Sequence, residues 1–341
     1  MWLSDLRDRT RQDLLEFAWR QWAQMGISAH FASPDRWAID PEALILFTVE
    51  VARRDPRLFD EVLDWMTRNR GLLSLQRLRN LSSRFPVDPS LVGAVVATAA
   101  GPALAAHWPR GEPEVGLASV FDRHVLSFIG EPDAVFESFG YSRPRVSRSK
   151  KSDEPDARLP VNLAFQLRLL FGPGSRSEVM RILLTCMDGP LDSARISDEA
   201  GFSKRNVSEA LAALVASRVV KARWSGNERT YLAYRKKWAE LLEIGPSADE
   251  MPSFVPWTHL FPALLVILFW LGKTAETTDS DYLVSSSARG LIERVAPDLE
   301  AAGLAVPSSR SFRGAAYLPA FVGTVESALV AIGAERSSGL A

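Results

Sequence analysis

Between residues 176 and 234 the spacing of apolar residues changes from that of helices to that of strands, and few small folds accommodate this order. The helical segments are Ser177–Met187, Ser193–Ala200 and Lys204–Ala216, and the segments with strand character are Val219–Trp224 and Thr230–Tyr234. Gly201 lies between the second and third helices, where a tight turn needs a permissive backbone. The pattern predicts three helices followed by a β-hairpin that turns at Ser225–Arg229.

The third of these helices is expected to have one buried and one exposed face. Val207, Leu211 and Leu214 recur at helical spacing and would anchor the helix to its own domain. Ser203 precedes the helix and is a candidate N-cap. The polar residues at the N-terminal end of the helix are Lys204, Arg205, Asn206 and Ser208. A helix anchored in this way presents cations and free backbone amides to an anion.

Positive charge is concentrated in the same part of the chain. Residues 175–240 hold twelve Lys or Arg against eight Asp or Glu, whereas the whole chain of 341 residues has a net charge of −1. A protein that coats nucleic acid non-specifically would be basic throughout. The distribution therefore predicts a local anion-binding surface on an otherwise balanced protein.

The stretch Ile196–Leu211, with the sequence ISDEAGFSKRNVSEAL, resembles the helix-turn-helix of bacterial winged-helix repressors related to the MarR and ArsR groups. The resemblance covers about sixty residues, including the hairpin that would be the wing. Ser217-Arg218 stands where that family often has a glycine before the hydrophobic pair that enters the wing.

The resemblance implies a DNA-binding transcriptional regulator, a repressor that occupies an operator. The implied DNA contacts are Ser203, Lys204, Arg205, Asn206 and Ser208 on the recognition helix, and Lys221, Arg223, Asn227 and Arg229 on the wing. Trp224 and Tyr231 are interpreted as packing residues. The expected partner is double-stranded DNA, and a homodimer is expected because paired half-sites reward one.

The rest of the chain is expected to be helical, so the predicted fold class is mainly α. The expected domains are a helical domain at 1–140, a basic linker at 141–158, a winged helix-turn-helix domain at 159–244 and a helical C-terminal domain at 245–341. The linker holds six Lys or Arg against three Asp or Glu. It is interpreted as an exposed connector, with a DNA-binding arm as the alternative.

One segment is apolar enough to raise the question of a membrane span. Phe254–Leu271 is eighteen residues long and has no formal charge. Pro256 and Pro262 within it favour a buried core helix or a dimer-interface helix over a span, so no membrane contact is expected. The N-terminus lacks the pattern of a signal peptide, and the single cysteine, Cys186, suits a reducing cytoplasm, which is the expected location.

The motifs of common enzymes do not occur, and the chain is expected not to be an enzyme. It has no nucleophile elbow, zinc-protease helix or dinucleotide fingerprint, and its four histidines are scattered, so neither a cofactor nor a metal is expected. Three alternatives stay open. The winged helix could serve protein contacts alone; the chain could be a protein-interaction partner, for example the antitoxin of a nucleotidyltransferase toxin that regulates its own operon; or it could be a nucleic-acid-processing enzyme that uses the module for docking.

Overall fold

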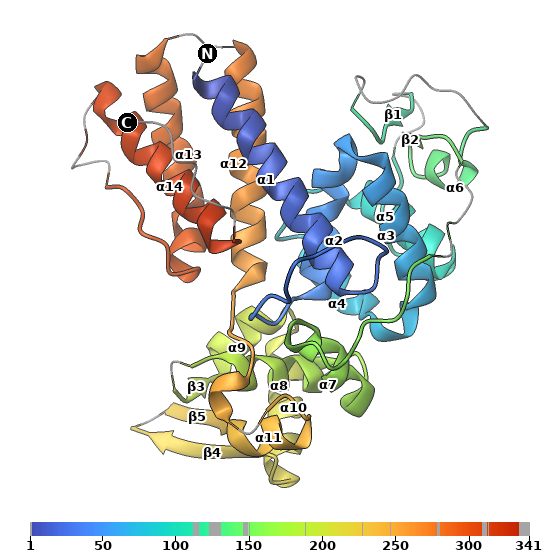
Figure 1. The fold of residues 1–341 in the computed structure, drawn as a ribbon, viewed down its shortest axis with the longest axis vertical. Helices are drawn as coiled ribbons and strands as arrows, with labels where there is room; N and C mark the ends of the chain where they lie inside the picture. The colour runs from blue at the N-terminus through green and yellow to red at the C-terminus, as the bar shows by residue number, and fades with distance from the viewer. Residues whose placement is uncertain are drawn as a thin grey trace. The chain divides into compact units, whose positions relative to one another are not determined.

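The computed structural model describes residues 2–111, 116–122, 131–145, 149, 151–187, 189–226, 228–245, 247–277, 280–308, 312 and 314–333. The protein is mainly helical, as the sequence predicts (Figure 1). It divides into two compact units, one of Met1–Trp19 with Pro256–Ala341 and the other of Arg20–Val255. Helix α1 (Trp2–Gln24) begins in the first unit, and its last turns belong to the second.

The first unit is built around an apolar helix. Its further elements are α12 (Trp257–Thr277), α13 (Asp281–Ala301), the 3-10 turn Gly314–Ala316 and α14 (Tyr317–Ala331). Trp257 stacks on Phe261 at 4.8 Å between ring centroids, and Phe17 of α1 meets Phe261 edge-on at 5.7 Å. These aromatic contacts join α1 to α12 in the core of the unit.

Among the described residues of this unit, two segments are long and apolar enough to cross a membrane, α12 and the stretch Gly314–Ala331. In α12, however, 61% of the most apolar window is buried within the protein, including Leu260 and Leu264. A core helix meets the same criteria of length and composition. This burial favours the expected core helix, and a role of α12 in a dimer stays a prediction.

The second unit begins with short helices that start at similar signals. They are α2 (Pro41–Val51), α3 (Pro56–Arg68), α4 (Leu75–Ser82), α5 (Pro89–Ala100) and α6 (Ala134–Glu137), with 3-10 turns at Ala52–Arg54 and Arg70–Leu72. Asp40, Asp55 and Asp88 each precede a proline and cap the helix through a backbone amide of its first turn. Strand β1 (Ala118–Ser119) pairs in parallel with β2 (Tyr141–Ser142).

The remainder of the second unit contains the helices and hairpin predicted from the spacing (Figure 1). Its elements are the 3-10 turn Pro160–Asn162, α7 (Leu163–Phe171), α8 (Ser175–Thr185), β3 (Leu191–Asp192), α9 (Ser193–Ala200), α10 (Lys204–Ala216), β4 (Val220–Ser225), β5 (Glu228–Ala233), α11 (Arg235–Leu241) and the 3-10 turn Ala248–Glu250. The strands form one antiparallel sheet in the order β3-β5-β4. The short strand β3, which the spacing did not predict, joins the hairpin to the start of α9.

Six buried charged residues join the short helices at the start of this unit to its later helices. We call them the ionic cluster: Asp40, Glu42, Arg77, Arg168, Glu178 and Arg181. Their side chains are at most 2% exposed. Arg77 Nη2 donates to Asp40 at 2.6 Å, and Arg168 Nη2 donates to Glu42 at 2.6 Å and to Glu178 at 2.7 Å. The ion pairs of the cluster connect α2 and α4 to α7 and α8. Because of these connections, residues 20–255 form one compact unit, without the domain boundary that was expected at residues 140–158.

The segment 141–158 differs in part from the exposed linker that was expected: Arg145, Lys151 and Arg158 are exposed, but Arg143 is not. Arg143 is buried, and its guanidinium donates to Asp60 at 2.5 Å. Three aromatic rings surround that guanidinium at 4.9–5.6 Å, those of Phe59, Phe121 and Phe136. Further along, the backbone amide of Asp153 donates to Gly26. Cation–π contact and ion pairing therefore hold Arg143, at the start of this segment, against the helices, a role that the basic composition of the segment did not indicate.

Candidate nucleic-acid interface

Helix α10 has the two faces that its sequence predicts. Val207, Ala210, Leu211 and Leu214 are buried, and they fix the helix against α8 and α9. The Ser203 hydroxyl accepts a hydrogen bond from the backbone amide of Asn206 at 3.2 Å, which caps the first turn. The buried face holds the helix in place and leaves its other face open to a ligand.

The predicted contact residues of α10 are placed on or beside this open face. Ser203, Lys204, Arg205 and Ser208 are exposed, and Asn206 is half-buried. Asn206 takes part in the cap, since its side-chain oxygen accepts from the Ser203 hydroxyl at 2.9 Å. Lys204, Arg205 and Ser208 are thus available at the N-terminal end, while Ser203 and Asn206 serve first to start the helix.

An acidic residue shares the exposed face. Arg205 Nε donates to Glu209 Oε1 at 2.9 Å, one turn further along α10, and the Arg205 side chain is 86% exposed. Both side chains lie in water, so this pair is easily exchanged for other partners. An approaching anion can therefore take Arg205 from Glu209.

The turn that leads into α10 is held by α4. Gly201 ends α9 with a left-handed backbone, φ +64°, and a Cβ there would lie 2.7 Å from the side chain of Leu81. Arg77 Nε donates to the carbonyl of Ala200 at 2.6 Å, and Asn80 donates to the carbonyl of Gly201 at 3.1 Å. Helix α4 thus satisfies the orphan carbonyls at the end of α9 and fixes the direction of the chain into α10.

Sequence reasoning missed this contribution of α4, because Arg77 and Ala200 are 123 positions apart. A local signal was nevertheless present. Arg77 occupies the same helical face as Leu78 and Leu81, which are buried, so its position was that of a core residue. A charged residue on an apolar face indicates a buried ionic partner elsewhere in the fold.

The hairpin places the predicted wing residues on two different faces. Side chains alternate along a strand, so Lys221 and Arg223 of β4 share a face with each other. Arg229 pairs with Trp224 across the ladder and lies on the opposite face, with its guanidinium over the ring of Tyr231 at 5.5 Å. Lys221, Arg223 and Arg229 are all exposed. The remaining wing prediction, Asn227, lies outside the described residues.

The packing role predicted for the two aromatic residues of the hairpin is right for one and wrong for the other. Tyr231 is 8% exposed and belongs to the core of the α8–α10 segment. Trp224 is 74% exposed. It lies on the same face as Val220, which is buried, but the hairpin has by then extended beyond the core, so alternation no longer implies burial.

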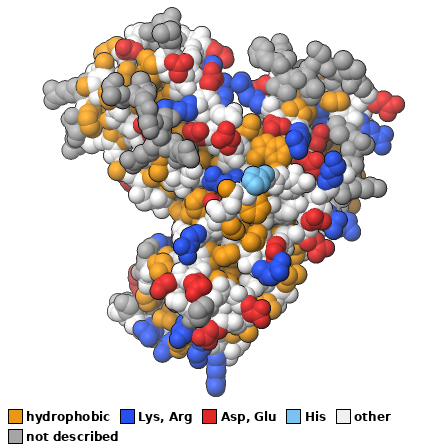
Figure 2. Space-filling view, viewed as in Figure 1, with side chains coloured by type: hydrophobic (Ala, Val, Ile, Leu, Met, Phe, Trp, Pro, Cys, Tyr) orange, Lys and Arg blue, Asp and Glu red, His pale blue; other side chains and the backbone are white. Residues whose placement is uncertain are grey.

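The exposed charge of this region remains positive once buried residues are set aside. Arg181, Glu178 and Glu199 are the buried charged residues described in the range 175–240, and leaving them out leaves eleven Lys or Arg against six Asp or Glu. Figure 2 shows Lys and Arg side chains gathered where Figure 1 draws β4 and β5, with some acidic side chains among them. The hairpin and α10 therefore carry cations that an anion can reach.

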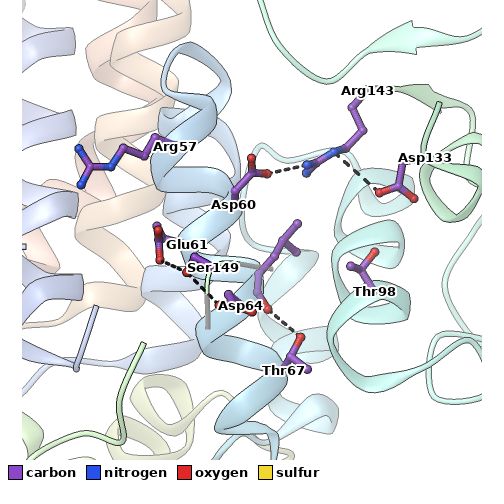
Figure 3. A pocket seen from close by; sticks show the side chains of 10 residues that line it. Arg57, Asp60, Glu61, Asp64, Thr67, Thr98, Asp133, Arg143 and Ser149 are labelled. Atoms are coloured by element: carbon purple, nitrogen blue, oxygen red, sulfur yellow. Dashed lines mark hydrogen bonds and ion pairs between the residues drawn. The ribbon is translucent and has the colours of Figure 1, made fainter. Parts of the chain in front are cut away.

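A second candidate site is an acidic cavity of about 420 Å³ beside α3 (Figure 3). Ser149 Oγ lies 2.9 Å from Glu61 and 3.0 Å from Asp64, while Arg143 contacts Asp60 and, at 3.9 Å, Asp133. Burial raises the pKa of Asp60, although the attraction of Arg143 opposes that rise.

The charged side chains that line this cavity pair with one another, which is typical of a structural role. Figure 3 shows its acidic side chains directed toward Arg143 and Ser149, so each has an internal partner. Among the residues that the structure describes, no group of three or more His, Cys, Asp or Glu side chains could hold a metal ion. The cavity accordingly carries no functional assignment.

Comparison of the chain with protein-family models, with curated proteins and with solved structures found no match. The functional argument therefore depends on the geometry of α10, the hairpin and the elements that hold them.

Proposed function

We propose that residues 175–233 form a winged helix-turn-helix and that the protein is a DNA-binding transcriptional regulator, acting as a repressor at an operator. The observation that carries the proposal is the construction of α10. Its buried face anchors it to α8 and α9, and Lys204, Arg205 and Ser208 are exposed at its N-terminal end. The sheet order β3-β5-β4, with a basic hairpin after α10, supports the same interpretation.

In this proposal α10 enters the major groove with its N-terminal end. Lys204 and Arg205 reach phosphates or guanine edges, and the Ser208 hydroxyl reaches a base edge. Backbone amides in the first turn add a favourable field for phosphate. Lys221, Arg223 and Arg229 of the hairpin contact the DNA backbone beside an adjacent groove. Phosphate contacts fix the register of the helix, and base contacts supply the sequence preference.

The test compares the full chain with a Lys204→Glu/Arg205→Glu variant on two duplexes, one from upstream of its own gene and one of random sequence. Both residues are exposed, so the variant should fold normally. We expect tighter binding of wild type to the upstream duplex and a loss on the order of 100-fold or more in the variant. A matched control, Lys273→Glu/Arg294→Glu, reverses two exposed charges of the other unit and should bind as wild type does.

Unchanged affinity of the Lys204→Glu/Arg205→Glu variant at fixed salt would contradict this placement of the recognition helix. Equal wild-type affinity for both duplexes would contradict a sequence-specific repressor. The urea midpoint of each variant, read by circular dichroism, shows whether a loss of binding reflects unfolding.

A protein-contact role is the second candidate, and one surface favours it. Leu169 and Leu170 of α7 and Leu241 of α11 are exposed leucines on neighbouring helices, since Phe171 and Trp238 of the same helices pack at 6.0 Å. Such a surface suits a second copy of the chain, as an operator-binding dimer requires, or another protein partner. Sedimentation of the full chain with and without Leu170→Glu tests it. A concentration-dependent dimer that the substitution dissociates supports this role, and a monomer in both cases contradicts a homodimer.

A further inference from the structure

Trp224 is the most exposed large hydrophobic side chain among the described residues, at 74%. Exposed single leucines are ordinary, but an indole has a large flat apolar surface that is rarely left in water without a partner. Cations lie over two other aromatic residues of the same part of the chain. Arg229 lies over Tyr231 at 5.5 Å, and Lys237 lies over Tyr234 at 5.4 Å. The described contacts place neither an aromatic ring nor a cation over Trp224.

The neighbours of Trp224 restrict what can cover it. Arg223 precedes it in β4, Arg229 lies opposite it in β5, and Lys221 is exposed three positions earlier in β4. One exposed acid, Glu228, lies next to Arg229, so cations outnumber acids around the indole. The cations Lys221, Arg223 and Arg229 would repel a partner whose apolar surface is surrounded by positive charge. An occupant that offers negative charge and an apolar surface within a few ångströms of each other suits both the cations and the indole.

We propose that Trp224 makes the uncharged contact between the hairpin and a DNA duplex, against the deoxyribose walls and base edges of the minor groove. Nucleic acid combines phosphates with apolar sugar and base surfaces at this spacing, and apolar side chains are known to enter the minor groove in this way. The inference rests on the proposed function, and it assigns to the hairpin a contact that its cations cannot supply.

The two faces of the hairpin fit such an entry. Arg229 shares a face with Trp224, and Lys221 and Arg223 occupy the other. A hairpin that approaches a groove with its tip directs one face toward each sugar–phosphate wall, so cations on opposite faces reach phosphates of different strands. Trp224 is close to the tip, one position before Ser225, the last residue of β4. It would enter furthest among the large side chains of β4.

The experiment measures duplex affinity of the full chain across a range of salt concentrations for wild type, Trp224→Ala, Trp224→Phe and Arg223→Ala. Removing an uncharged contact should lower affinity at every salt concentration by about tenfold and leave the slope of log K against log salt unchanged. Arg223→Ala should instead reduce the magnitude of that slope by about 0.9. Trp224→Phe should keep most of the affinity, and Tyr282→Ala, which removes an exposed aromatic ring of the other unit, should keep all of it.

The outcomes separate this inference from the function on which it rests. If Trp224→Ala binds as tightly as wild type while Lys204→Glu/Arg205→Glu does not bind, the role of Trp224 is overturned and the proposed function stands. If Trp224→Ala alters the salt slope, or alters the oligomeric state and leaves DNA affinity intact, the indole serves another purpose and the inference is again overturned. If wild type does not bind duplex DNA at any salt concentration, both proposals fail.

Discussion

The arginines of the ionic cluster and those of the proposed DNA surface are the same residue type in opposite surroundings. Arg77, Arg168 and Arg181 are buried and contact carboxylates from other elements. Arg205 and Arg223 are exposed, and a DNA phosphate could approach either of them. Burial therefore decides whether an arginine stabilises the fold or is available to bind a ligand. A count of charges along the chain does not distinguish the two roles.

The ionic cluster is tolerated in the protein interior because its positive and negative charges balance. It has three arginines and three carboxylates, and removing one member leaves an uncompensated charge out of reach of water. Burial alone would raise the pKa of Glu178, but the attraction of Arg77, Arg181 and Arg168 outweighs burial and holds that pKa well below 4.5. For Asp40, burial is likewise outweighed, chiefly by Arg77, and its pKa falls below 3.8.

The largest effect is expected from Arg77→Leu, which removes a member of the ionic cluster and the donor to Ala200. Breaking a buried ion pair on one side costs about 3–5 kcal/mol, because the carboxylates stay buried without their partner. We expect a loss of that size in the free energy of unfolding of the unit Arg20–Val255, measured by urea titration.

Arg79→Leu is the matched control, since Arg79 is exposed on the same helix. It should change the free energy of unfolding by no more than about 0.5 kcal/mol. If Arg77→Leu and Arg79→Leu lowered the free energy of unfolding equally, the claim that the buried arginine stabilises the fold more than the exposed one would be contradicted.

Acid should act on the ionic cluster next. Asp40 and Glu178 have folded-state pKa values below their ordinary 3.8 and 4.5, so the unfolded chain takes up protons first. Their stabilising contribution is complete above about pH 4.5 and is lost as the pH falls below it. The urea midpoint of wild type should thus be lower at pH 3.5 than at pH 6.

The urea midpoint of Arg77→Leu at pH 3.5 and pH 6 shows whether this arginine acts through its charge. Protonation relieves carboxylates that have lost their arginine, so the deficit of this variant relative to wild type should narrow in acid. A deficit that is the same at pH 6 and at pH 3.5 would show that Arg77 acts through packing alone.

The smallest effect is expected at the exposed pair of α10. Glu209→Gln removes an acid from the proposed DNA face and frees Arg205, so duplex affinity should rise several-fold while the urea midpoint stays the same. Glu300→Gln, an exposed acid on α13, is the control and should leave affinity unchanged. Weaker binding by Glu209→Gln would mean that Glu209 itself accepts a hydrogen bond from the DNA, for example from a cytosine amino group.

Much of the local structure follows from the sequence, because its signals are local. The Asp-Pro starts of α2 and α3, the helices α8 to α10 and the hairpin are all set by spacing, caps and turn residues within a few positions. Features that depend on distant partners could not be predicted in this way. The burial of Arg143 depends on aromatic rings from three other segments, and its basic neighbours suggested an exposed linker.

The candidate site shows the same limit. The faces of α10 follow from its periodicity, but the hold of α4 on the turn at Gly201 depends on residues more than 120 positions apart. The exposure of Trp224 depends on how far the hairpin extends beyond the core, which strand alternation does not encode.

The central claim is that the exposed cations of α10 and the hairpin bind duplex DNA, and the salt dependence of binding by the wild-type full chain tests it most directly. The cations concerned are Lys204, Arg205, Lys221, Arg223 and Arg229. If all five neutralise phosphates, log K should fall with log salt at a slope of about −4 to −5, since each releases about 0.9 counterion. A slope near zero, or no binding at low salt, would contradict the account.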